Sequence, residues 1–211
     1  MARDRWATFD CYGTLIDWNG GIRVQLARVF GEQRADELLQ RYHELEPQLE
    51  ADGTLSYREV LTEAMRRLGA PAGEESALAD SLPGWQPFPE VPAALEEARG
   101  RGWKLAILSN TDRDYIDASL RRLGDGFELA IVASEIGSYK PALGHWRAFE
   151  ERVGRLPDAH VAASLFHDVG PASELGLPSV WINRLGETPG PEPTRELPDL
   201  ARLGETLDEL A

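Results

Sequence analysis

"FDCYGTLIDW", residues 9–18, ends an apolar run with one carboxylate, Asp10, and follows it closely with Gly13 and Thr14. The run that leads into it, "RWATFD" at 5–10, is typical of a buried strand. Gly13 permits a sharp turn because it has no side chain. A charge between a buried strand and a turn lies at the edge of a sheet, so the neighbouring strands decide what it faces.

Four further short apolar runs recur at wide spacing, at 103–110, 127–135, 160–168 and 179–183, with helical stretches between them. This alternation predicts an α/β fold with a Rossmann-like, doubly wound parallel sheet. No comparable run occurs in residues 19–83, where apolar residues follow helical spacing. The sequence therefore predicts a core domain of residues 1–14 and 85–211, with a helical cap domain of residues 15–84 inserted after the first strand. The last stretch, 184–210, predicts a polar loop and a terminal helix.

The composition limits the possible partners. The 36 acidic and 22 basic residues give a net charge of -14, which argues against binding to nucleic acid or to an anionic membrane. No apolar run approaches the roughly 18 residues that span a bilayer. The single cysteine, Cys11, cannot form an intrachain disulfide, and the chain opens without a charged-then-apolar leader. These features predict a cytoplasmic protein.

Polar residues follow several of the predicted strands. Asp10 follows the first strand, Ser109 and Asn110 end the second, Lys140 comes a short loop after the third, and Asp168 ends the fourth. Singly, each is typical of a helix cap or a solvated loop. Ligands of open parallel sheets bind at the carboxyl ends of the strands, so together these residues predict one crevice.

With these residues in place, the chain resembles the haloacid dehalogenase superfamily over nearly its whole length. Asp10 with Thr14 matches the first motif of that family, Ser109 the second, Lys140 the third and Asp168 the fourth. The resemblance implies that Asp10 is a nucleophile that forms an ester or acyl-phosphate, which water then cleaves. It also implies that Lys140 keeps Asp10 ionised. Ser109 and Thr14 then donate hydrogen bonds to an anionic group of the substrate.

Position 12 bears on the substrate class. Phosphatases of the superfamily carry a second Asp there as general acid, whereas this chain has Tyr12, whose phenol has an ordinary pKa of about 10. Halide leaves without a proton, and the pattern is similar to that of the type II 2-haloacid dehalogenases. The resemblance thus implies a hydrolytic dehalogenase of small 2-haloacids, with a small anionic organic substrate, no required cofactor and a possible homodimer.

Two alternatives remain open. A Mg²⁺-dependent phosphatase of small metabolites could use Asp10, Asp168 and the backbone carbonyl of Tyr12 to ligate the ion. A non-catalytic relative could use the fold for binding alone, since one fold serves many functions.

The resemblance also assigns substrate-binding residues. Arg41 is the best positional match to a cap arginine that holds a carboxylate or halide, although an exposed arginine paired with a neighbouring helix glutamate is an equal alternative. Tyr12 and Asn110 are expected in the pocket, together with Trp146, which stands where the family usually has tyrosine. His167, beside Asp168, is expected to act as an acid or base or to lie at the surface.

Overall fold

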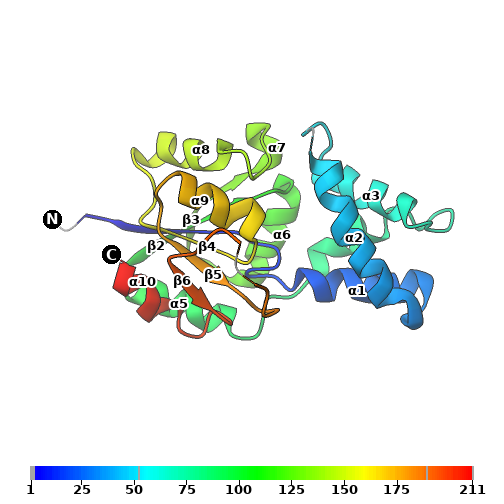
Figure 1. The fold of residues 1–211 in the computed structure, drawn as a ribbon, viewed down its shortest axis with the longest axis horizontal. Helices are drawn as coiled ribbons and strands as arrows, with labels where there is room; N and C mark the ends of the chain where they lie inside the picture. Colours follow the sequence, from blue (N-terminus) through cyan, green and yellow to red (C-terminus); the bar gives the residue numbers. More distant parts are fainter. Residues whose placement is uncertain (1–2, 52, 189, 211) are drawn as a thin grey trace.

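The computed structural model describes residues 3–51, 53–188 and 190–210, which form a six-stranded sheet and two sets of helices (Figure 1). All neighbouring strands are parallel, in the order β3-β2-β1-β4-β5-β6. The strands are β1 (Arg5–Phe9), β2 (Trp103–Ser109), β3 (Phe127–Val132), β4 (Ala159–Ala162), β5 (Ser179–Ile182) and β6 (Arg195–Leu197). This confirms the predicted α/β fold with a parallel sheet.

Helices cover both faces of this sheet because its central strands bury alternate side chains on opposite sides. Trp6 of β1 packs with Trp146 and Phe149 on one face, whereas Ala7 and Phe9 belong to the larger core on the other. On the first face lie α7 (Ala133–Ile136), α8 (Gly144–Val153) and α9 (Gly170–Glu174). The other face is covered by α5 (Val91–Gly100), α6 (Arg113–Leu123) and α10 (Leu203–Leu210).

The cap helices α1 (Trp18–Phe30), α2 (Ala35–Glu50), α3 (Tyr57–Arg67) and α4 (Ala77–Ser81) lie beyond the carboxyl ends of the strands (Figure 1). Asp17 caps α1 by accepting a hydrogen bond from the Gly20 backbone N–H. The buried carboxylate of Asp112, in the loop after β2, accepts hydrogen bonds from the backbone N–H groups of Tyr57 and Arg58. The start of α3 is therefore fixed to the core beside the strand ends. The predicted domain boundaries stay a prediction.

Three predicted features differ from the structure. The strand predicted at 160–168 ends at Ala162 and continues into a single π-helical turn, Leu165–Val169, while the one predicted at 127–135 ends at Val132, where α7 begins. Within 184–210, where the sequence predicts a polar loop and a terminal helix, the strand β6 precedes the helix; its side chains are mostly exposed and so carry no apolar pattern. The predicted terminal helix is present as α10. None of the helices in residues 3–51, 53–188 and 190–210 is both long and apolar enough to span a bilayer.

Candidate active site

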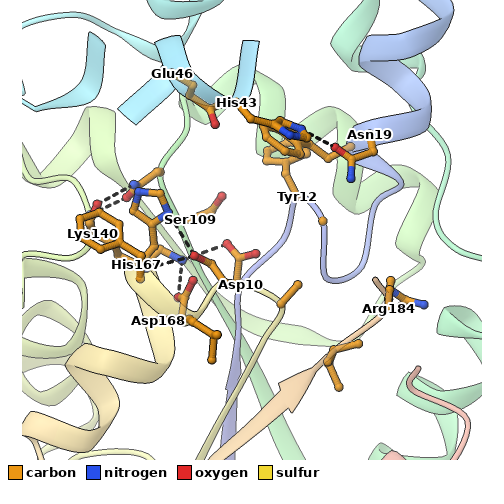
Figure 2. Close-up of a pocket in the computed structure, with 18 of the residues that line it drawn as sticks. Asp10, Tyr12, Asn19, His43, Glu46, Ser109, Lys140, His167, Asp168 and Arg184 are labelled. Carbon is orange, nitrogen blue, oxygen red and sulfur yellow. Dashed lines mark hydrogen bonds and ion pairs between the residues drawn. The ribbon is translucent and has the colours of Figure 1, made fainter. Parts of the chain in front are cut away.

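Lys140 links the two carboxylates that follow β1 and β4. Its Nζ lies 2.9 Å from Asp10 Oδ1 and 2.6 Å from Asp168 Oδ1, and it donates a third hydrogen bond to the Leu108 carbonyl (Figure 2). The Lys140 side chain is 1% exposed. An ammonium group with three acceptors and almost no contact with water is fixed in place, so it holds both carboxylates in one arrangement.

The charges of this triad stabilise one another. Burial alone would lower the pKa of Lys140, but Asp10 and Asp168 outweigh burial and raise it. Burial alone would raise the pKa of Asp168, but Lys140 and His160 outweigh burial and lower it. Lys140 is therefore protonated and Asp168 ionised at neutral pH.

The turn after β1 orients the second oxygen of Asp10. Thr14 Oγ1 donates to Asp10 Oδ2 at 2.8 Å and accepts a hydrogen bond from the Ala163 backbone N–H at 2.9 Å. Gly13 allows the turn that brings Thr14 back to Asp10, because its φ of 88° is a backbone angle that residues with a side chain rarely adopt. Asp10 is thus held by Lys140 on one oxygen and by Thr14 on the other.

Asp168 is held through a single oxygen. His160, fully buried on β4, is within hydrogen-bonding distance of Asp168 Oδ1 through Nε2 at 2.9 Å and of Thr8 Oγ1 through Nδ1 at 2.9 Å. Asp168 Oδ2 is buried and has no hydrogen-bond partner within the described residues, so it is a free acceptor beside Asp10. Sequence reasoning missed His160, whose only signal is a polar side chain in an apolar strand.

The side chains of the site offer a magnesium ion few ligands. Asp10 and Asp168 already share the ammonium of Lys140, which occupies the space between them. Over the ranges that the structure describes, no group of three or more His, Cys, Asp or Glu side chains is arranged to hold a metal ion. The predicted ligand set would need Asp10 and Asp168, which Lys140 already binds, together with the backbone carbonyl of Tyr12 and water.

The triad forms the floor of a cavity of about 550 Å³ between the strand ends and the cap. Helix α2 contributes the roof through His43, Glu46, Pro47 and Glu50. Glu46 Oε1 accepts hydrogen bonds from the hydroxyls of Tyr42 at 2.9 Å and Tyr57 at 2.8 Å. Burial raises the pKa of Glu46 to about 7 and that of Glu50 well above its usual range. The roof therefore carries two carboxyl groups that burial favours in their protonated form.

Known proteins with a similar sequence or fold show the family of this chain. Residues 5–164 match the model of a protein family described as haloacid dehalogenase-like hydrolases. The chain belongs to this family. It is 30% identical over 219 residues to the (S)-2-haloacid dehalogenase of Pseudomonas sp. (strain YL), covering 96% of this chain and 94% of that protein. It is also 30% identical over 182 residues to the phosphoserine phosphatase of Thermus thermophilus, covering 81% of this chain and 72% of that protein.

A solved structure shares the fold of this haloacid dehalogenase-like hydrolase. The L-2-haloacid dehalogenase from Xanthobacter autotrophicus superposes with a TM-score of 0.86 at 21% identity, over 99% of this chain and 100% of that one. Another structure of that enzyme has chloropropionic acid covalently bound. The relatives confirm the predicted family and its hydrolase class, and they include both dehalogenases and phosphatases.

Within this hydrolase, the structure brings together most of the residues predicted for the site. Asp10, Ser109, Lys140 and Asp168 line the pocket, and Thr14 contacts Asp10 directly. Tyr12 lines it too, with its hydroxyl 3.0 Å from Ser119 Oγ. Asn110 also lines the pocket.

Asn110 additionally positions the lysine. Its amide accepts a hydrogen bond from the Lys140 backbone N–H at 2.6 Å and donates one to the Lys140 carbonyl at 3.0 Å. The same amide nitrogen donates to Glu50 Oε2 at 3.2 Å. Asn110 therefore ties the loop that carries Lys140 to the roof of the pocket.

Two predicted substrate-binding residues lie elsewhere. Arg41 is exposed and does not line the pocket. At 3.6 residues per turn it lies about 140° around α2 from Glu46 and about 180° from Glu50. Trp146 is fully buried beneath the sheet, where its ring packs edge-on against His160 at 5.2 Å. We expected both side chains to line the pocket, and neither does. The rotation of α2 turns Arg41 away from the pocket, and the packing of α8 buries Trp146 under the sheet.

His167 does line the pocket. Its Nδ1 is 3.2 Å from Ser164 Oγ, and its Nε2 is 3.8 Å from Glu50 Oε2. Burial lowers the pKa of His167, which favours the neutral ring at pH 7. His167 therefore lies in the pocket, and its expected role as an acid or base stays a prediction.

Proposed function

We propose that this hydrolase cleaves carbon–halogen bonds of small organic acids through an ester on Asp10. The observation that supports this most is the nucleophile's setting: Asp10 is fixed by Lys140 and Thr14, and position 12 supplies no ready proton donor. Burial raises the pKa of Tyr12 well above its usual value, which makes the phenol a weaker acid still. A leaving group that needs no proton suits such a site.

In the first step, an Asp10 carboxylate oxygen attacks the carbon that bears the halogen. A carbon–oxygen bond forms, the carbon–halogen bond breaks, and the halide leaves with the bonding electron pair. Lys140 remains protonated and holds Asp10 in line for attack.

In the second step, water attacks the ester carbonyl of Asp10. The free Asp168 Oδ2 is the buried acceptor suited to take a proton from that water. The bond between the Asp10 carbonyl carbon and the substrate oxygen breaks, the departing alkoxide takes the proton back from Asp168 to give the hydroxy acid, and the second proton of the water is released. Asp10 is regenerated with one oxygen that comes from water.

The proposal is tested by two assays in parallel. Purified protein is assayed for halide release from chloroacetate and 2-chloropropionate, and for phosphate release from a panel of metabolite phosphates, each with Mg²⁺ and with EDTA. We expect halide release that persists in EDTA and disappears in the Asp10→Asn variant. Phosphate release that requires Mg²⁺, without halide release, would replace the proposal with the phosphatase alternative.

A further inference from the structure

The roof of the active-site pocket is made of carboxylates that lack a cation. Glu46 is 8% exposed and Glu50 is 7% exposed, one helical turn apart on α2. Both tyrosine hydroxyls bind Glu46 Oε1, and within the described residues no hydrogen bond is recorded to Oε2. Figure 2 shows the Glu46 carboxyl group extending from α2 toward Ser109 and Asp10. Within the described residues, Glu46 therefore has one oxygen, Oε2, that remains available to a ligand in the pocket.

The charges that line the pocket are unbalanced. Six acidic side chains line it, from Asp10, Asp17, Glu46, Glu50, Asp168 and Glu187, and burial raises the pKa of Glu46 and of Glu50. Only two lysine or arginine side chains face it from the described ranges, and both are engaged. Lys140 binds Asp10 and Asp168, while Arg184 pairs with Glu90 at 2.7 Å. Ionising Glu46 and Glu50 is costly without a counter-charge, so a cation that enters the pocket would favour their ionised form and bind to it.

The walls beside this roof suit the same kind of group. The rings of Trp18 and Tyr57 line the pocket next to Glu46, and the Trp18 indole N–H donates to the Tyr57 hydroxyl at 3.1 Å. Aromatic rings attract cations through their negatively charged faces. An arginine that could hold a substrate carboxylate at the roof is missing from the described lining, since Arg41 lies outside it.

We propose that the substrate carries a protonated amine, which binds to Glu46 and Glu50 while Asp10 attacks the carbon at its other end. The substrate class is then a 2-haloacid with an ammonium group at the end of its chain. The dehalogenation of such a substrate rests on the proposed function. The ammonium site does not, because it depends only on the residues of the roof.

Turnover tests the substrate class with a matched pair of compounds, 6-amino-2-chlorohexanoate and 2-chlorohexanoate. We expect kcat/KM for halide release to be at least about tenfold higher for the amine, because only the amine pairs with the buried carboxylates. The Glu46→Gln variant should bring the ratio close to one while its amide oxygen still accepts from both tyrosines. The Glu44→Gln variant is the control, because Glu44 lies on the same helix, is exposed and does not line the pocket. Equal kcat/KM for the two compounds in the wild type would overturn the inference.

Binding tests the ammonium site independently of turnover. Calorimetric titration of the wild type with 6-aminohexanoate and with hexanoate should show tighter binding of the amine, and the preference should fall in both Glu46→Gln and Glu50→Gln. If neither chloro compound releases halide but this preference holds, dehalogenation fails and the ammonium site stands. If hexanoate binds as tightly as the amine, the ammonium site is overturned whatever the turnover shows. Far-UV circular dichroism spectra that match the wild type confirm that the variants are folded.

Discussion

Replacing Lys140 with methionine should remove the central charge of the site and destabilise the fold. Lys140 Nζ makes ion pairs of 2.9 and 2.6 Å with Asp10 and Asp168, whose side chains are 12% and 1% exposed. Removing one partner of a buried ion pair costs about 3–5 kcal/mol, because the remaining charge stays buried. With a urea m-value of about 2 kcal/mol/M, the unfolding midpoint falls by roughly 2 M.

The loss of stability in the Lys140→Met variant should be larger at neutral pH than at acidic pH. The folded-state pKa of Asp168 is depressed, so its contribution to stability is present above the unfolded value of about 3.9 and is lost as pH falls toward the folded value. The pKa of Lys140 is raised, so its contribution persists until pH rises past about 10.4. The difference between wild type and Lys140→Met should therefore be largest near pH 7 and shrink toward pH 4, where the variant's buried carboxyl groups take up protons.

Urea unfolding at pH 7.5 and at pH 4.5 measures both effects. Lys104→Met is the matched control, because Lys104 pairs with Asp4 at 2.7 Å but the two side chains are 38% and 60% exposed. Such a surface pair contributes about 0–1 kcal/mol. A Lys140→Met loss no larger than that of Lys104→Met, or one that stays constant as pH falls, would refute this reasoning.

Three further outcomes follow from the site. Thr14→Val removes a hydrogen bond to the Asp10 carboxylate, worth about 1.5 kcal/mol, and should lower kcat/KM for halide release about tenfold; an unchanged rate would contradict its orienting role. Arg41→Ala should leave halide release within about twofold of the wild type, since a surface residue outside the pocket contributes little. Because burial raises the pKa of Glu46 to about 7, its ionisation opposes folding as pH rises. Glu46→Gln should therefore raise the unfolding temperature more at pH 8 than at pH 5, as followed by differential scanning fluorimetry.

Much of the floor of the site could be predicted from the sequence because it depends on topology. Asp10, Ser109 and Lys140 follow apolar runs that a parallel sheet brings to one edge, and the structure joins Asp10 and Lys140 by a hydrogen bond. The prediction needed only the spacing of the strands and the chemistry of the residues that end them.

The roof of the site depends on how a helix is rotated, which local sequence does not determine. Arg41 and Glu46 lie on one helix, and only the packing of α2 against α1 and α3 decides which of them faces Asp10. His160 was missed for a related reason, because its contact with Asp168 depends on the turn that follows β4. The edge strand β6 is stabilised by backbone pairing with β5, which leaves no apolar pattern in its side chains.

The proposed mechanism is tested most directly by following oxygen into Asp10. The protein is mixed with a sub-stoichiometric amount of 2-chloropropionate in H₂¹⁸O, and in parallel with an excess, and peptides are then analysed by mass spectrometry. If Asp10 forms the ester and water attacks its carbonyl, the first turnover gives lactate without ¹⁸O, and the peptide that contains Asp10 gains the label. Label that appears in lactate during the first turnover, with Asp10 unlabelled, would mean that water attacks the substrate directly and would contradict the nucleophilic role of Asp10.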